Sequence, residues 1–146
     1  MQKDIYFFPS SLKNIEELTW LNEADTDCVW IYPENPQQKE AAEDMLIQKL
    51  ILNPRVLNSD LKNIAILQYT GRERFHFLKK NTSFRKFALF GVEPKQMGIH
   101  LSLPKYQLVR FMGYEFLLLD KPELLKNLPK EKKILLAQVL REFTNK

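Results

Sequence analysis

Residues 28–54 of the chain read CVWIYPENPQQKEAAEDMLIQKLILNP. The run Cys28–Tyr32 is apolar and favours β-structure, and Pro33 ends it, so it predicts a buried strand. Apolar residues at helical spacing then predict a helix over residues 37–52; they are Ala41, Met45, Leu46, Leu50 and Ile51. Asn53-Pro54 ends this helix, because the residue before a proline is disfavoured in helical geometry. A strand, a turn and a helix in this order are typical of an α/β fold.

Residues 55–70 predict two further short elements. Arg55–Leu57 is expected to be a strand. Ser59 is a candidate N-cap for a helical stretch, since four apolar positions share one helical face; they are Leu61, Ile64, Ala65 and Tyr69.

The remainder of the chain alternates strand and helix signals. Phe84–Val92 predicts a strand that the chain leaves at Gly91, and residues 109–119 predict a hairpin or a bent strand around Gly113. Pro122 suits the first turn of a short helix. Residues 130–143 predict the last helix, with one apolar side made of Ile134, Leu135, Val139, Leu140 and Phe143.

The fold class that follows is α/β: a three-layer sandwich with a small, mostly parallel sheet of about four strands flanked by helices. We divide the chain into an N-terminal apolar or helical segment, residues 1–26, and a single α/β domain, residues 27–146. The N-terminal segment contains the apolar knot Ile5–Phe8 and a stripe with a spacing of three, formed by Leu12, Ile15, Leu18 and Leu21. It is either a docked helix of the domain or a docking arm for a partner.

Composition and charge exclude several classes of protein. The 146 residues are 45% hydrophobic and 27% charged, as in an ordinary globular domain. We expect neither a secretory signal nor a membrane span, so the expected location is cytoplasmic. Residues 1–44 carry a net charge of −7 and residues 45–146 a net charge of +11. This asymmetry indicates either that the two parts meet different partners or that their charges complement each other within one compact domain.

Motifs for catalysis are missing from the sequence. The four glycines are too far apart for a phosphate-binding loop, and there is neither a GxSxG nor an HExxH motif. Cys28 is expected to be buried and inert, and His76 and His100 to have surface or packing roles. We therefore predict no enzyme, no metal and no cofactor. The enzymatic alternative needs a polar pocket at the carboxyl ends of the strands, near Pro33, Gly91 or Asp120.

A basic and aromatic segment, residues 71–86, carries the second function considered. Its basic residues are Arg72, Arg74, Lys79, Lys80, Arg85 and Lys86, interleaved with Phe75, Phe77 and Phe84. Cations neutralise phosphates and exposed rings stack on bases, so this composition suits single-stranded nucleic acid. The alternative is an exposed basic loop that its phenylalanines anchor to the core.

The aromatic residues of the N-terminus form the candidate partner-binding site. They are Tyr6, Phe7, Phe8 and Trp20, and the apolar Ile5 belongs to the same candidate site. Aromatic side chains often anchor protein–protein interfaces, although packing in the core is the alternative for most of these residues.

The order of segments from about residue 28 to residue 143 resembles the psi subunit of the bacterial DNA polymerase III clamp loader, in a divergent form. The resemblance rests on the strand 29–32 closed by Pro33 and on the helix that ends in LILNP at residues 50–54. It continues through RVLNS (55–59), LKNIAIL (61–67), FALFG (87–91) and Leu103-Pro104, and closes with DKPELL (120–125) and the helix reaching LREF (140–143).

The resemblance implies a non-catalytic adaptor in DNA replication with a fold similar to that of uracil-DNA glycosylases. It further implies that a short N-terminal segment docks on the clamp-loader ATPase subunits, that the body holds a chi-like subunit, and that Trp20 matches the docking tryptophan. Contact with nucleic acid would be weak or indirect. Two features differ from the family: residues 1–27 are acidic rather than basic, and the segments 71–86 and 93–106 are longer.

Overall fold

The computed structural model describes residues 19–20, 26–33, 63–80 and 83–144. The helix predicted over residues 37–52, the strand predicted over residues 55–57 and the apolar knot Ile5–Phe8 lie outside the described residues.

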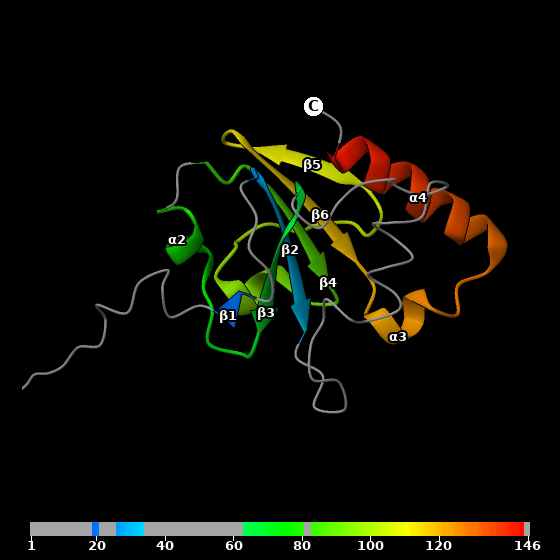
Figure 1. The fold of residues 1–146 in the computed structure, drawn as a ribbon, viewed down its shortest axis with the longest axis horizontal. Helices are drawn as coiled ribbons and strands as arrows, with labels where there is room; N and C mark the ends of the chain where they lie inside the picture. The colour runs from blue at the N-terminus through cyan, green and yellow to red at the C-terminus, as the bar shows by residue number, and fades with distance from the viewer. Residues whose placement is uncertain (1–18, 21–25, 34–62, 81–82, 145–146) are drawn as a thin grey trace, which may run out of the picture.

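Six strands of the described chain form one sheet (Figure 1). They are β1 (Thr19–Trp20), β2 (Cys28–Pro33), β3 (Ala65–Tyr69), β4 (Lys86–Phe90), β5 (Leu108–Phe111) and β6 (Tyr114–Leu119). The order across the sheet is β1-β3-β2-β4-β6-β5. β3, β2, β4 and β6 run parallel, whereas β1 and β5 are antiparallel at the two edges. The predicted α/β class with a mostly parallel sheet is confirmed, with two antiparallel strands added to the four parallel ones.

The parallel strands are mostly apolar because both of their faces are buried. In β2, Trp30 packs into the core on one face of the sheet, and Val29 and Ile31 pack into the core on the other. Trp30 lies between Ile66 of β3 and Ala88 of β4 in the register. The prediction of a buried strand over residues 28–32 is therefore confirmed.

The helical prediction for residues 61–69 is wrong over Ala65–Tyr69, which form strand β3. The side chains of Ile64 and Ile66 enter the core on one face, and those of Ala65 and Leu67 enter the core on the other. This alternation has a period of two, as a strand requires. The helical prediction rested on Leu61, Ile64, Ala65 and Tyr69, but residues 64–67 are four consecutive apolar residues, which satisfy a strand pattern as well.

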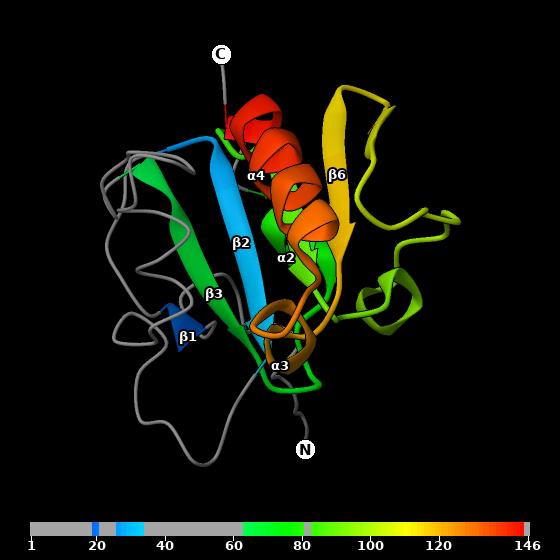
Figure 2. The same ribbon diagram turned by 90° about the vertical axis from the view of Figure 1, so that its right-hand side faces the viewer.

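Helices cover both faces of the sheet (Figure 2). The face that carries Trp30 is covered by α3 (Pro122–Leu125) and α4 (Lys130–Thr144). The buried residues of α4 are Leu136, Val139, Leu140 and Phe143. The opposite face is covered by α2 (Phe75–Leu78) and the 3-10 helix η5 (Pro94–Met97), through Leu78 and Met97.

Residues 108–119 form a hairpin, which decides between the two predicted alternatives. Phe111 pairs with Tyr114, and the two residues between them have positive φ, 52° at Met112 and 84° at Gly113. A two-residue turn of this kind matches the right-handed twist of the paired strands.

Strand β1 adds Trp20 to the edge of the sheet. Trp20 pairs with Leu67 of β3, and its ring lies 5.5 Å from that of Phe84. The helix expected for the N-terminal segment therefore does not extend through Trp20. Among the described residues, no helix combines the length and apolarity that crossing a membrane requires.

Candidate functional site

A hollow lies at the carboxyl edge of the sheet, where the parallel strands end. Its volume is about 320 Å³, and its lining residues are Pro33, Tyr69, Thr70, Gly71, Gly91, Val92 and Gln96. The chain continues from β2 to β3 on one side and from β4 toward β6 on the other. In open α/β sheets, the crevice at such a divergence is the usual place for a ligand. Pro33 and Gly91 are two of the three residues near which the enzymatic alternative required a pocket.

The wall that follows β3 is held by the carboxylate of Glu73. Glu73 is only 4% exposed. Its Oε1 accepts hydrogen bonds from the backbone N–H groups of Thr70 at 2.7 Å and Arg72 at 3.3 Å, and its Oε2 accepts one from the Thr70 hydroxyl at 2.8 Å. These three hydrogen bonds offset the free-energy cost of removing the carboxylate from water. Because their donors belong to Thr70 and Arg72, the carboxylate fixes the turn at residues 70–72.

The wall that follows β4 depends on Gly91 and on a reciprocal cap of η5. Gly91 has φ +74°, and a Cβ there would lie 2.8 Å from the Lys121 Cα. At η5, the Gln96 side chain accepts a 2.8 Å hydrogen bond from the Glu93 N–H, while the Glu93 side chain accepts one from the Gln96 N–H. The Tyr69 hydroxyl donates to the Gln96 carbonyl at 3.4 Å, a long bond between the two walls.

A polar cluster lies beyond β6 at the same edge. Lys105 Nζ donates to Asp120 Oδ1 and the Tyr106 hydroxyl donates to Asp120 Oδ2, both at 2.6 Å. Hydrogen bonds from Lys105 and then Tyr106 lower the pKa of Asp120 below its ordinary value. The Asp120 bond raises the pKa of Lys105, and burial followed by this bond raises the pKa of Tyr106. Near neutral pH these shifts keep the carboxylate ionised and both donors protonated. The cluster therefore links the end of β6 to the loop before β5, and its carboxylate oxygens are already occupied by these two donors.

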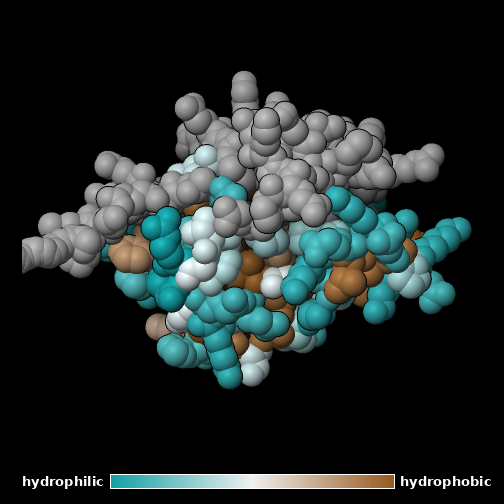
Figure 3. All heavy atoms as spheres, turned by 90° about the horizontal axis from the view of Figure 1, so that it is seen from below, coloured by the Kyte–Doolittle hydropathy of each residue, from teal (hydrophilic) through white to brown (hydrophobic). Residues whose placement is uncertain are grey.

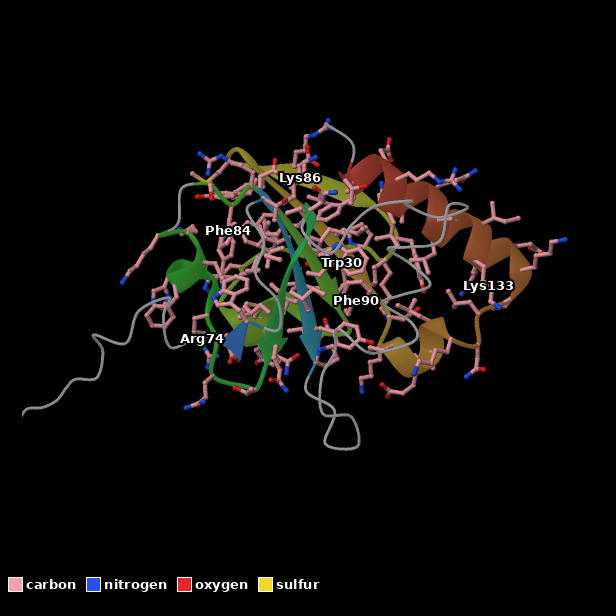
Figure 4. The ribbon with its side chains drawn as sticks, in the orientation of Figure 1. Trp30, Arg74, Phe84, Lys86, Phe90 and Lys133 are labelled. Carbon is pink, nitrogen blue, oxygen red and sulfur yellow. The ribbon has the colours of Figure 1, made fainter. Side chains whose placement is uncertain are left out.

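The structure divides the predicted nucleic-acid residues between two ends of the sheet (Figure 4). Arg74 lies toward the carboxyl edge, whereas Phe84 and Lys86 lie toward the amino ends of the strands. Arg72 adjoins Arg74 and is exposed. Lys86 is 8% exposed, so its assignment to a surface is wrong. It begins strand β4, where its backbone N–H donates to the Asp27 carbonyl.

Lys79, Lys80 and Arg85 are exposed, as predicted. Each lies over an aromatic ring, at 5.6, 5.4 and 5.7 Å from the centroids of Phe75, Phe77 and Tyr114, respectively. Phe75 also packs on the rings of Phe87, Tyr114 and Phe116. Phe84 is buried. Two of the three phenylalanines therefore anchor the segment to the core, as the alternative interpretation expected.

The partner-binding residues expected near the N-terminus fall mostly outside the described chain. Only Trp20 is described, and it is half-buried against the core. Ile5, Tyr6, Phe7 and Phe8 lie outside the described residues, so their interface role stays a prediction.

An apolar surface that the sequence did not predict lies on α3 and α4. Leu124 is 55% exposed, Ile134 51% and Leu135 42%. The prediction placed Ile134 and Leu135 on the buried side of α4, but the buried stripe begins at Leu136. Five exposed lysines surround this unit; they are Lys121, Lys126, Lys130, Lys132 and Lys133. Figure 3, viewed from the carboxyl edge, shows hydrophobic surface among hydrophilic residues toward the end that carries α3.

Groups with reactive side chains are separated in the described part of the chain. Cys28 is buried, and burial followed by the nearby Asp27 charge raises the pKa of its thiol. His76 and His100 are both exposed. Over residues 19–20, 26–33, 63–80 and 83–144, no three His, Cys, Asp or Glu side chains gather closely enough to hold a metal ion.

No protein-family model, curated protein or solved structure matches this chain.

Proposed function

We propose that the chain is a non-catalytic adaptor subunit of a bacterial DNA polymerase III clamp-loader complex, acting in the cytoplasm. It would join the ATPase subunits to further replication proteins, with a chi-like subunit as one partner. The resemblance to the psi subunit supports the specific complex. The observation that supports a protein-binding role is the exposure of three apolar side chains on α3 and α4, which are Leu124, Ile134 and Leu135 and are called the α3–α4 surface below.

The α3–α4 surface has the chemistry of an interface. Each of its three side chains leaves about half of its area in water. Covering apolar area stabilises a complex by about 25 cal/mol per Å², so such side chains favour association when a partner fits them. The surrounding lysines keep the uncomplexed surface solvated.

The experiment is co-elution of the full chain with the clamp-loader ATPase subunits of the same organism on a sizing column. The first variant combines Leu124→Ser, Ile134→Ser and Leu135→Ser. The matched control is Met112→Ser, which removes a side chain that is 80% exposed on the β5–β6 hairpin. We expect the triple variant to weaken the complex at least about a hundredfold and the control to leave it unchanged.

A truncation tests the N-terminal arm separately. Removal of residues 1–18 is preferred to removal of 1–26, because the shorter truncation keeps strand β1 and the Trp20–Phe84 contact. Loss of the complex on this truncation assigns the interface to the arm. A complex that is unaffected by both the truncation and the triple variant would contradict both assigned interfaces.

Binding of single-stranded nucleic acid is the second candidate, favoured by the exposed cations Lys79, Lys80 and Arg85 above their rings. Each phosphate contact contributes about −0.7 to the slope of log affinity against log salt. We expect Lys79→Ala/Lys80→Ala/Arg85→Ala to make this slope shallower by about 2, measured by fluorescence anisotropy with labelled DNA. Lys133→Ala, on α4, is the control. An unchanged slope would exclude this segment as a phosphate-binding surface.

A further inference from the structure

The hollow at the carboxyl edge lies beside the ends of β2 and β4, where the strand order of the sheet reverses direction. The strand that follows β2 in the chain, β3, lies on one side of the β2–β4 pair, and the strands that follow β4, β5 and β6, lie on the other side, so the neighbouring ends of β2 and β4 form a switch point of the sheet. The lining residues Pro33 and Gly91 follow from this arrangement. The volume of about 320 Å³ is near the lower end of sites that hold small molecules.

The backbone around the hollow is open to close approach. Gly71 has φ +101°, and a Cβ built there would meet nothing within 4 Å. The turn at Gly71 is rigid nonetheless, because the buried Glu73 carboxylate binds the flanking N–H groups of Thr70 and Arg72. A ligand can therefore contact a fixed backbone without displacing a side chain.

The charges beside the hollow are unbalanced. Arg72 follows Gly71, Lys95 precedes Gln96, and the Lys121 backbone lies against Gly91. All three cations are exposed, and none makes an ion pair with a described residue.

The nearby carboxylates are engaged in hydrogen bonds within the protein. Glu73 accepts three hydrogen bonds, Glu93 closes the cap of η5, and Asp120 is held by Lys105 and Tyr106. The hydrogen bonds to Glu73 and Glu93 come from neutral groups and leave their charges in place, whereas Asp120 is paired with Lys105. Among the described residues, the three cations Arg72, Lys95 and Lys121 therefore outnumber the two unpaired carboxylates, which leaves a net positive charge around the hollow.

We propose that this hollow binds a small organic phosphate. Two of its lining residues, Thr70 and Gln96, are polar and uncharged. The Thr70 hydroxyl already donates to Glu73 and the Gln96 oxygen already accepts from the Glu93 N–H, so the Thr70 oxygen as acceptor and the Gln96 amide N–H groups as donors suit the uncharged, hydrogen-bonding body of the ligand. Arg72, which follows the lining residue Gly71, and Lys121, which lies against the lining residue Gly91, suit the phosphate, which gains more from two separate cations than a singly charged carboxylate does. This site is independent of the α3–α4 surface, so it stands whether or not the adaptor proposal holds.

The experiment titrates the full chain with AMP, ribose 5-phosphate and pyrophosphate, followed by calorimetry and by the chemical shifts of backbone amides. Adenosine and ribose are the matched ligands without phosphate. We expect at least one organic phosphate to bind about tenfold or more tightly than its uncharged counterpart, with shifts concentrated at Thr70, Gly71 and Gly91. Arg72→Gln and Lys121→Gln are each expected to weaken this binding about tenfold, whereas Lys133→Gln leaves it unchanged.

Three results would overturn the proposal: no binding by any phosphate of the panel at millimolar concentration, equal binding with and without the phosphate, or unchanged binding in both the Arg72→Gln and the Lys121→Gln variants. An oligonucleotide with a 5′-phosphate distinguishes the source of the ligand. If it binds more tightly than AMP and at the same amides, the phosphate is the end of a nucleic acid.

Discussion

Asp120 joins the end of strand β6 to the loop that precedes β5. Its two carboxylate oxygens accept hydrogen bonds from Lys105 and Tyr106. Tyr106 has φ 62°, a left-handed conformation that is unfavourable for a bulky residue, so the bond to Asp120 offsets a local cost. Because Lys105 is half exposed, the ion pair itself contributes little, and the Tyr106 bond contributes the larger part.

The stability that Asp120 provides depends on pH. Its folded-state pKa lies below the unfolded value of about 3.9, so the contribution is complete above about pH 4 and is lost as pH falls through the folded pKa. We expect Asp120→Asn to lower the free energy of unfolding by about 1–2 kcal/mol near neutral pH and to flatten its acid dependence. Urea unfolding of the two proteins at a series of pH values from acid to neutral measures both the loss of stability and its acid dependence. Parallel pH curves for the two proteins would show that Asp120 titrates as it does in the unfolded chain.

Cys28 provides a label for global unfolding. It is the single cysteine of the chain, and it is buried with a raised pKa. Since the thiolate is the reactive form, we expect a thiol reagent to react at least about a thousandfold more slowly with the native protein than with protein in guanidinium. Fast reaction in the native state would mean that strand β2 opens locally, against the buried position found here.

The burial of Lys86 could not be predicted from the local sequence. This lysine follows the exposed Arg85 in a segment rich in basic residues, and nothing in the local sequence distinguishes it from the exposed cations of that segment. Its burial follows from two backbone hydrogen bonds that the Asp27 carbonyl accepts from Arg85 and Lys86 as β4 begins. Such a long-range bond leaves no local signal.

At the scale of elements, the turn after β4 is the part most sensitive to substitution. Gly91 and Gly113 have similar φ values, +74° and +84°, but only Gly91 lies against another backbone, that of Lys121. Alanine at either position incurs the cost of a left-handed conformation, about 1–2 kcal/mol. Gly91→Ala adds a collision at 2.8 Å, so we expect it to destabilise the fold by about 1–3 kcal/mol more than Gly113→Ala. Equal losses in denaturant unfolding would mean that the Gly91 turn moves freely.

Some strands and helices could be predicted from their own residues, and others could not. β2, the β4 strand, the β5–β6 region and α4 were predictable because proline, glycine or long periodicity bounds each of them. Residues 64–67 were not, since four consecutive apolar residues satisfy both a helical and a strand pattern. In α4 the helix was predicted correctly, but the choice of buried side depends on its contact with the sheet, which exposes Ile134.

At the scale of the whole molecule, the fold class and the carboxyl edge were predictable and the strand order was not. Parallel strands end at one edge, so Pro33 and Gly91 were expected to meet there, as they do at the hollow. The positions of β1 and β3 depend on how the chain crosses the sheet, and no residue pattern encodes that path. A two-residue strand such as β1 carries no periodicity at all.

The two proposals assign different surfaces of the molecule to different partners. The α3–α4 surface suits a protein, and the hollow at the carboxyl edge suits a small phosphate. Substitutions at Leu124 and at Arg72 should therefore act on one binding event each. This separation allows each proposal to fail without the other.

The central claim is that the chain is an adaptor of the clamp loader, and co-elution of the full chain with the ATPase subunits tests it most directly. The account predicts a stable complex at micromolar concentration that the α3–α4 triple variant loses and that Met112→Ser retains. Separate elution of the full chain and the ATPase subunits at that concentration would contradict it.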